Sequence, residues 1–138
     1  MQISAQIVNK KNENSVLLKT ENNTHSINIP SQKSGFGSGV NGGEFLFLAL
    51  AACYCNDIYR EAGKQGIEVK SVEVEVKGDF YAESLPASSI TYSATVKAAA
   101  KRDAIIELMN LTDKVSEIQN TLRKGVPVTL VSAEAISV

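Results

Sequence analysis

The first part of the chain alternates between apolar and polar residues, and this pattern predicts three short strands. The alternation covers residues 2–9, 15–20 and 24–29, and short polar turns join the three segments. Such an arrangement is typical of an antiparallel meander. Pro30 ends the predicted sheet because it has no N–H to donate to a ladder. Residues 31–43 are rich in Gly and Ser and predict a long loop, of the kind that often serves a function or an interface.

A continuous apolar run, residues 45–55, replaces the alternation. We expect a helix over residues 44–64, because Glu44 favours the positive end of a helix dipole and Gly66 suits a C-terminal cap. The first three turns of this helix are apolar on every side, so we expect them to be buried all round. The later turns are amphipathic.

The second half of the chain returns to strands and then to helices. Strict alternation over residues 67–81 predicts a strand, and residues 88–98 predict its antiparallel partner. Apolar residues at helical spacing predict two helices, over 102–111 and 114–124. Residues 126–138 again read as a strand, which would close the fold.

The order of these elements favours an α+β fold with antiparallel sheets. Strands and helices do not alternate regularly, as they would in a doubly wound α/β fold. The length of 138 residues predicts a single domain, residues 1–138.

Composition and charge narrow the classes of function. Net charge is −1, so we expect no nucleic-acid partner, which would favour a basic face. The N-terminal segment has no apolar signal region, and the apolar run is too short to cross a bilayer, which predicts a cytoplasmic protein without a membrane partner. Two Cys and one His give no metal-ligand pattern, so we expect neither a metal nor a cofactor.

The predicted loop contains a glycine pattern that also occurs in dinucleotide-binding sites. Residues 37–42 read G-x-G-x-x-G before a helix. A dinucleotide site needs a strand that leads directly into the glycines and an acidic residue about 20 positions later. Pro30 separates the preceding strand from these glycines. The next predicted strand does not supply the acidic residue at the spacing that such a site requires. A flexible loop is therefore the better interpretation.

Both cysteines lie near the centre of the predicted helix. Cys53 and Cys55 are two positions apart, so their side chains point to nearly opposite sides of the helix. A disulfide between them would require the helix to unwind. Taken alone, the pattern favours buried thiols that pack as small apolar groups over reactive thiols.

One stretch carries a family resemblance. The sequence GGEFLFLALAACYCNDI, residues 42–58, resembles the core signature of the OsmC/Ohr family, P-x-E-L-L-L-x-A-L-x-x-C-x-x-x-D-[VI]. The strand GIEVKSVEVEVKG, residues 66–78, and the segment NTLRKGVPVT, residues 120–129, resemble the same family. The predicted order of elements agrees over nearly the whole chain.

The resemblance implies an α+β, OsmC-like fold with antiparallel sheets packed around long central helices in an intertwined homodimer. It also implies a thiol-dependent reductase of organic hydroperoxides in oxidative stress, in which a cysteine on the central helix attacks a small apolar hydroperoxide and an external thiol reductant restores it. Cys53 matches the reactive position, and Glu44 matches the acid at the helix start. Asp57 matches the later acid of the motif.

This chain also departs from the family pattern. The second, resolving cysteine of the family falls at Ser116, which cannot form a disulfide. The family's N-terminal loop supplies an arginine, but no Arg precedes Arg60 here. Lys33 is the loop's cation, and an ammonium lacks the planar fork of a guanidinium. Gly42 stands where the motif has proline.

Three hypotheses therefore follow from the sequence, and whether the chain is an enzyme stays open among them. The first is a one-cysteine peroxidase that uses Cys53, resolved by an external thiol or by Cys55 after local unwinding. The second is a non-catalytic dimer that binds a small ligand in an apolar pocket. The third is a redox-sensing dimer in which oxidation of Cys53 changes the association of the chains.

Overall fold

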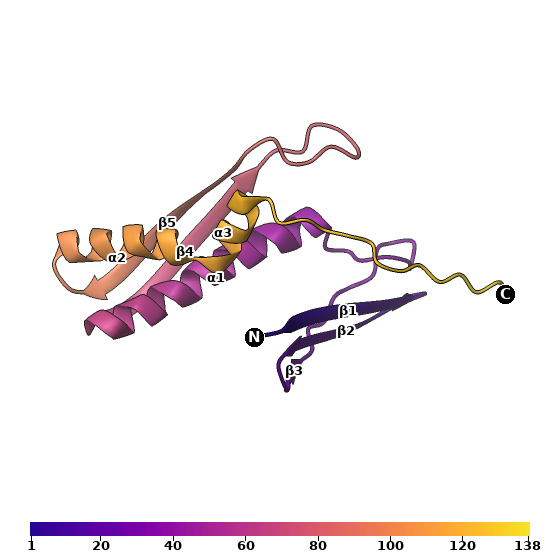
Figure 1. The fold of residues 1–138 in the computed structure, drawn as a ribbon, viewed down its shortest axis with the longest axis horizontal. Coiled ribbons are helices and arrows are strands. Elements are labelled where there is room, and N and C mark those ends of the chain that lie inside the picture. Colours follow the sequence, from indigo (N-terminus) through magenta and orange to yellow (C-terminus); the bar gives the residue numbers. More distant parts are fainter. The chain divides into compact units, whose positions relative to one another are not determined.

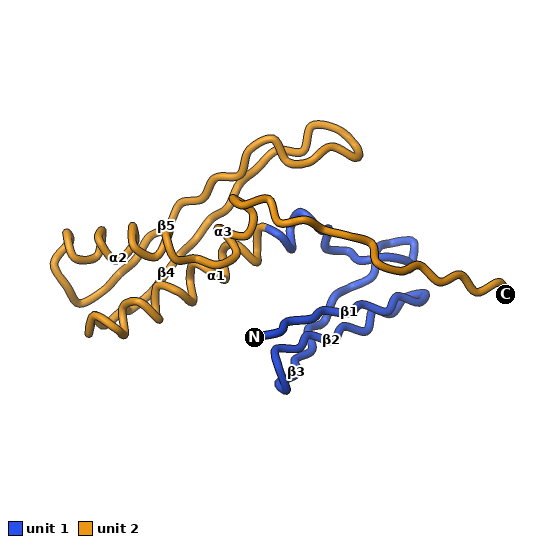
Figure 2. The backbone as a smooth tube through the Cα atoms, in the orientation of Figure 1, with its two compact units in different colours: residues 1–46 blue, residues 47–138 orange.

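The computed structural model describes residues 1–138, in which five strands and three helices follow the order predicted from the sequence (Figure 1). The elements are β1 (Ile3–Lys10), β2 (Glu13–Thr20), β3 (Asn23–His25), α1 (Gly42–Gln65), β4 (Glu68–Gly78), β5 (Ile90–Ala99), α2 (Arg102–Val115) and α3 (Glu117–Lys124). The chain divides into two compact units, Met1–Leu46 and Phe47–Val138, and the boundary falls within α1 (Figure 2). The α+β class with antiparallel sheets is confirmed.

The first unit contains the predicted meander, β1-β2-β3, with antiparallel pairing throughout. The predicted loop is bonded to the turn between β1 and β2: the N–H of Asn12 donates to the carbonyl of Gly35 at 2.6 Å, and the side chain of Asn14 donates to the carbonyl of Gly37 at 3.3 Å. These bonds hold the glycine-rich segment against the meander.

The sheet of the first unit has little buried surface of its own. Every residue of β1 is exposed, and Ile7 keeps 52% of its surface accessible. A small meander needs an apolar face covered by another layer to be stable. The strand pattern read from the sequence is therefore present, but its apolar positions lie open.

The second unit has a core between two helices and a hairpin. Strands β4 and β5 pair antiparallel, with Val72 opposite Val96 and Val74 opposite Ala94. The core consists of buried residues from α1 and α2, against which the apolar side chains of the hairpin pack; the buried residues are Tyr54, Ile58, Ala62 and Leu108. The second half of α1 therefore packs against the hairpin, and α2 packs against the same core (Figure 1).

Glycines end two of the helices, as left-handed backbone geometry requires. Gly66 follows α1 with φ +68°, and its neighbour Ile67 donates an N–H to the carbonyl of Ala62 at 3.0 Å. Gly125 follows α3 with φ +65° and donates to the carbonyl of Leu122 at 3.0 Å. Residues with a Cβ adopt this conformation at a cost, so glycine is the usual choice at a helix end.

Three details differ from the sequence-based expectations. Residues 126–138, predicted as a closing strand, form neither strand nor helix and lie exposed. A strand needs neighbouring backbone groups to bond to, and in this chain none pairs with that segment. The third strand is shorter than predicted and ends at His25. The apolar first half of α1 is not buried all round, since Leu48 is 63% exposed.

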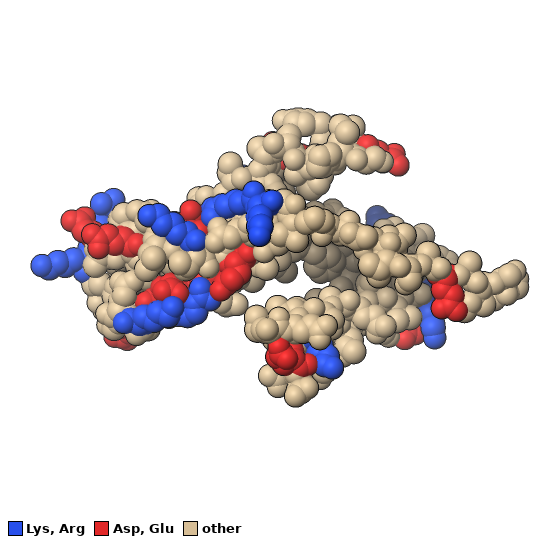
Figure 3. Space-filling view, viewed as in Figure 1, with Lys and Arg blue, Asp and Glu red and all other residues tan.

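None of the helices combines the length and the apolarity that crossing a bilayer requires. Charged side chains of both signs lie side by side over the helices on the face drawn in Figure 3. This mixture agrees with the near balance of 14 basic and 15 acidic residues in the sequence.

Candidate functional site

The first turn of α1 is capped by a pair of reciprocal hydrogen bonds. The backbone N–H of Asn41 donates to the carboxylate of Glu44 at 2.8 Å, and the N–H of Glu44 donates to Oδ1 of Asn41 at 2.8 Å. This is a capping box, which satisfies two backbone donors at the helix start. Glu44 therefore has a structural partner at the position where the sequence placed a site acid.

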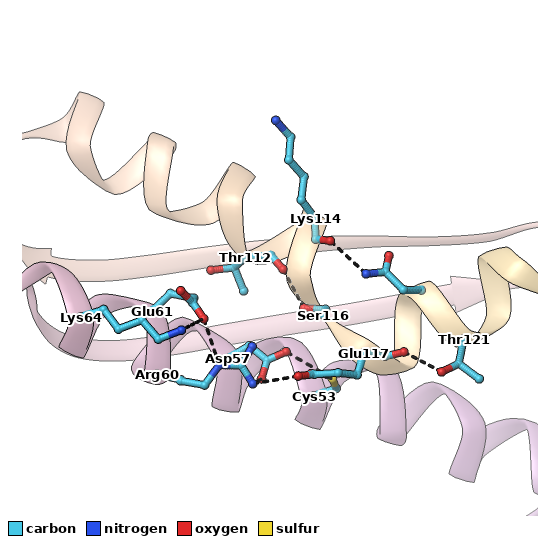
Figure 4. Close-up of polar contacts among 11 residues, drawn as sticks. Cys53, Asp57, Arg60, Glu61, Lys64, Thr112, Lys114, Ser116, Glu117 and Thr121 are labelled. Atoms are coloured by element: carbon cyan, nitrogen blue, oxygen red, sulfur yellow. Dashed lines mark hydrogen bonds and ion pairs between the residues drawn. The ribbon is translucent and has the colours of Figure 1, made fainter.

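Cys53 lies half-buried on the face of α1 that meets α3 (Figure 4). Its thiol donates to Oδ2 of Asp57 at 3.4 Å, one helical turn further along. Oε2 of Glu117, in the first turn of α3, lies 4.0 Å from Sγ. The structure thus brings together Cys53 and Asp57, as the motif spacing allows, and adds Glu117 from a distant part of the chain.

Arg60 joins the carboxylates around Cys53. Its Nη1 lies 2.9 Å from Oδ1 of Asp57 and 3.1 Å from Oε1 of Glu117, while its Nε lies 2.9 Å from Oε1 of Glu61. Lys64 also pairs with Glu61 at 2.9 Å. The side chains of Asp57 and Glu61 are only 7% and 8% exposed, whereas those of their cationic partners Arg60 and Lys64 are 40% and 64% exposed.

Opposing influences act on the pKa of the Cys53 thiol. Burial raises this pKa above its ordinary value, and the carboxylates of Asp57 and Glu117 raise it further because they repel a thiolate. A hydrogen bond from the backbone of Ile118, at the start of α3, lowers the pKa. The balance is a raised pKa, so the thiol is protonated near neutral pH.

Neither Cys55 nor the residue at position 116 forms a redox pair with Cys53. Cys55 is a free thiol, as is Cys53. Ser116, where the resemblance places a resolving cysteine, is fully buried, and its Oγ donates to the carbonyl of Thr112 at 2.8 Å. Ser116 also separates α2 from α3, with an extended backbone between the two helices.

Sequence reasoning identified part of this cluster and missed the rest. Asp57 was found through the motif, and Arg60 lies seven positions after Cys53, a spacing that returns to the same helix face. That periodicity could have identified Arg60 as a neighbour of the thiol. Glu117 lies 64 positions from Cys53, and no local pattern links the two residues.

A small cavity lies between α1, β5 and α3. Its volume is about 100 Å³, and its lining includes Leu50, Ile90, Leu122, Tyr92, Gln119 and Arg123. Gln119 is 3% exposed and donates from Nε2 to the carbonyl of Leu50 at 3.0 Å. Its Oε1 has no hydrogen-bond partner within the chain. Such an orphaned buried acceptor is uncommon in folded proteins.

The fold resembles several solved structures at low sequence identity. An OsmC-like protein from Mycoplasma pneumoniae matches with a TM-score of 0.60 and 18% identity, covering 89% of each chain. A hypothetical protein from Aquifex aeolicus matches with a TM-score of 0.64 and 16% identity, covering 90% of this chain and 89% of the other. An organic hydroperoxide resistance protein from Legionella pneumophila matches with a TM-score of 0.52 and 16% identity, covering 89% and 90%.

Comparison with curated proteins gives no match. The family model of OsmC-like proteins, in contrast, matches residues 35–131, which is more than half of the chain. This range includes the helix that carries Cys53, the hairpin that supports it and the α3 turn that contacts it. The chain therefore belongs to the family of OsmC-like proteins.

Proposed function

We propose that this protein reduces small apolar organic hydroperoxides with Cys53 as its nucleophile, in defence against oxidative stress. The observation that carries the proposal is the position of the Cys53 thiol, half-buried beside Asp57 and bonded to the backbone at the start of α3. Helix N-termini favour thiolates in reactive cysteines. One structural neighbour is named an organic hydroperoxide resistance protein, which supports the same activity.

The proposed reaction begins with attack of Sγ on the terminal oxygen of the hydroperoxide. Asp57 accepts the thiol proton, since the two side chains are already hydrogen-bonded. The O–O bond breaks, the sulfur loses two electrons, and the alkoxide takes the proton and leaves as an alcohol. Cys53 is left as a sulfenic acid. Arg60 stabilises the negative charge of Asp57 before the proton is taken.

An external thiol then restores the enzyme. It attacks the sulfenic acid, releases water and forms a mixed disulfide with Cys53; a second thiol displaces Cys53 and leaves in a disulfide with the first. Ser116 cannot take the role of a resolving cysteine, and Cys55 lies two positions from Cys53 on a regular helix. The dependence on external thiols suits a protein of the reducing cytoplasm, where we place it.

Glu44 is the second residue that we assign to the site, following the family resemblance. Its carboxylate accepts the N–H of Asn41 and fixes the start of the helix that carries Cys53. We assign it a positioning role through this contact.

We also propose that the protein acts as a homodimer. A single chain leaves many large apolar side chains more than one-third exposed, in β1, in the first half of α1 and after α3; examples are Ile7, Leu48, Leu130 and Val131. Large exposed apolar areas on a protein mark sites of interaction with other molecules. A second copy could cover these positions and supply strand partners to residues 126–138.

The peroxidase proposal is tested by trapping the sulfenic acid. Reduced protein is mixed with stoichiometric cumene hydroperoxide and dimedone, and the peptides are weighed by mass spectrometry. We expect a rapid adduct on Cys53 that is absent in Cys53→Ser and unchanged in Cys55→Ser. No adduct over many minutes would exclude peroxidase chemistry. An adduct without hydroperoxide turnover in the presence of dithiols would instead indicate a redox sensor.

A second candidate function, binding of a small ligand, is favoured by the cavity next to Gln119. An apolar ligand with a hydroxyl or amide group could donate to the orphaned Oε1, and Arg123 offers a cation at the same cavity. Phenol is a suitable probe for such a site. Binding measured by calorimetry should be lost in Gln119→Leu, which leaves no acceptor, and unchanged in Gln32→Leu, outside the cavity lining.

A further inference from the structure

Three donor atoms converge at the thiol in a way that the sequence did not indicate. Sγ of Cys53 and one carboxylate oxygen from each of Asp57 and Glu117 all lie within 4.8 Å of one another. In a tetrahedral zinc site, with bonds of about 2.3 Å to sulfur and about 2.0 Å to oxygen, sulfur and oxygen ligands are about 3.5 Å apart. The separations observed here are 3.4 Å to Asp57 and 4.0 Å to Glu117.

The adjustment needed between sulfur and the two carboxylates is small and falls on the more exposed carboxylate, that of Glu117. The contact between Cys53 and Asp57 already has the length expected of two zinc ligands. Glu117 must approach Sγ by about half an ångström to reach the ideal edge. Its side chain is 65% exposed, so solvent rather than packed protein surrounds it and the movement meets little resistance.

Arg60 pairs with one oxygen of each of the two carboxylates and leaves the other oxygen free. It binds Oδ1 of Asp57 and Oε1 of Glu117, and the remaining oxygen of each carboxylate faces Sγ (Figure 4). Carboxylates that bind metals are commonly held in place by such outer hydrogen bonds. The guanidinium therefore occupies the oxygens that the metal would not use.

The charge of the cluster also matches a divalent cation. When Cys53 is a thiolate, it and the carboxylates of Asp57, Glu61 and Glu117 carry four negative charges, against two positive charges on Arg60 and Lys64. A dication neutralises the remaining two. A donor set of one sulfur and two oxygens suits Zn²⁺ better than Mg²⁺ or Ca²⁺, which prefer oxygen alone.

We propose that Cys53, Asp57 and Glu117 form a site for Zn²⁺ or a similar thiophilic divalent cation, and that the bound ion protects the Cys53 thiol from peroxide. Binding exchanges the thiol proton, which passes to solvent, for a bond between sulfur and the metal. The fourth coordination position is open to water, because Glu117 lies at the surface. The protective effect rests on the proposed function, whereas binding of the ion does not.

The binding site is tested with the full chain, reduced and freed of metal by a chelator that is then removed. Zn²⁺ is titrated by calorimetry, and Co²⁺ is used as a spectroscopic probe of sulfur ligation. We expect one Zn²⁺ per chain and a sulfur-to-cobalt charge-transfer band. Both should disappear in Cys53→Ser, and Asp57→Asn and Glu117→Gln should each weaken Zn²⁺ affinity at least about tenfold.

Two matched controls make the result decisive. Cys55→Ser removes the other thiol and should leave the affinity for Zn²⁺ unchanged. Glu107→Gln removes an exposed acid of α2 and should also leave it unchanged. Retention of full affinity in Cys53→Ser or in Glu117→Gln would overturn the proposal. Because the side chain of Glu117 is exposed, its variant tests the site even if Asp57→Asn folds poorly.

The protective effect has a separate readout. Sulfenic-acid trapping on Cys53 is repeated with saturating Zn²⁺ and again after a chelator is added. We expect Zn²⁺ to slow adduct formation at least tenfold and the chelator to restore it; an unchanged rate at saturation would refute protection. If Zn²⁺ binds but metal-free protein forms no adduct, the peroxidase proposal fails while the binding site stands.

Discussion

Arg60 and Glu117 are 57 positions apart in the sequence and form an ion pair of 3.1 Å between the C-terminal part of α1 and the first turn of α3. The pair places a carboxylate and a helix N-terminus beside the same thiol. The two influences oppose each other, because the carboxylate disfavours the thiolate and the backbone of Ile118 favours it. The pKa of the Cys53 thiol therefore depends on how the first turn of α3 is held.

Removing the charge of Glu117 should make Cys53 more reactive. In Glu117→Gln, the repulsion of the thiolate decreases and the pKa of Cys53 falls toward its ordinary value. In metal-free protein with Cys55→Ser as background, the rate of alkylation by iodoacetamide should rise with pH in both forms, with a lower midpoint in the variant. An equal or higher midpoint would show that Glu117 does not affect the thiol. Glu107→Gln is the matched control.

The same substitution should have little effect on stability. Both side chains of the pair are substantially exposed, 40% for Arg60 and 65% for Glu117, and such pairs contribute less than about 1 kcal/mol. Chemical denaturation of the variant should therefore give a free energy of unfolding within about 1 kcal/mol of the original. A larger loss would indicate that the pair supports the contact between α1 and α3 in another way.

Alkaline pH should destabilise the protein through Tyr54. Burial raises the pKa of Tyr54 to about 12, and the charge of Asp113 adds to the shift. The unfolded chain ionises Tyr at about pH 10, so this contribution is complete below that pH and is lost as pH rises toward 12. Denaturation at a series of pH values should show stability declining over this window.

The Tyr54→Phe variant separates this effect from general alkaline unfolding. It removes the hydrogen bond from Tyr54 to the carbonyl of Met109, 2.9 Å long, and should cost about 1 kcal/mol at neutral pH. The decline between pH 10 and 12 should then be shallower than in the original protein. Tyr59→Phe, at a residue 46% exposed, should leave the decline unchanged.

Two substitutions distinguish a capping role of Glu44 from a role of its charge in the reaction. Glu44→Gln preserves a side chain that can complete the capping box, whereas Glu44→Ala removes it and should cost about 1 kcal/mol of stability. If the carboxylate matters only for capping, Glu44→Gln should keep the rate of sulfenic-acid formation at Cys53. A loss of rate at unchanged stability would instead show that the charge itself takes part.

Replacing Ser116 tests whether the missing second cysteine explains a dependence on external thiols. Ser116 precedes the α3 turn that contacts Cys53, and in Ser116→Cys we expect a disulfide with Cys53 after one equivalent of hydroperoxide. Peptide mapping without reduction would identify it. The side chain must turn away from Thr112, so a loss of about 1 kcal/mol in stability is also expected. Thr121→Cys, in the exposed part of α3, should form no such bond.

Local patterns were sufficient to predict most elements of this fold. Strict alternation identified β4, and the sequence between Glu44 and Gly66 identified α1, because helix dipoles and left-handed caps act over a few residues. Residues 126–138 show the limit of this reasoning. Their alternation indicates a strand, but strand formation depends on a partner, and nothing in the segment itself says whether this chain supplies one.

In the candidate site, too, local spacing predicts one contact of the thiol and tertiary packing determines the other. Asp57 follows Cys53 by one helical turn, so the motif was enough to place the two side chains together. Glu117 reaches the thiol only because Ser116 breaks the helix before α3 and redirects the chain. That change of direction depends on tertiary packing, which explains why the sequence indicated a thiol site but not its second carboxylate.

The spacing along α1 also limits how this protein can vary. Cys53, Asp57 and Arg60 share one helix face only while the number of residues between them is kept. Insertion or deletion of a single residue would rotate everything beyond it by about 100° and turn the thiol away from its partners. Substitutions at these positions can adjust the chemistry, but gaps between them should be absent wherever related chains retain the site.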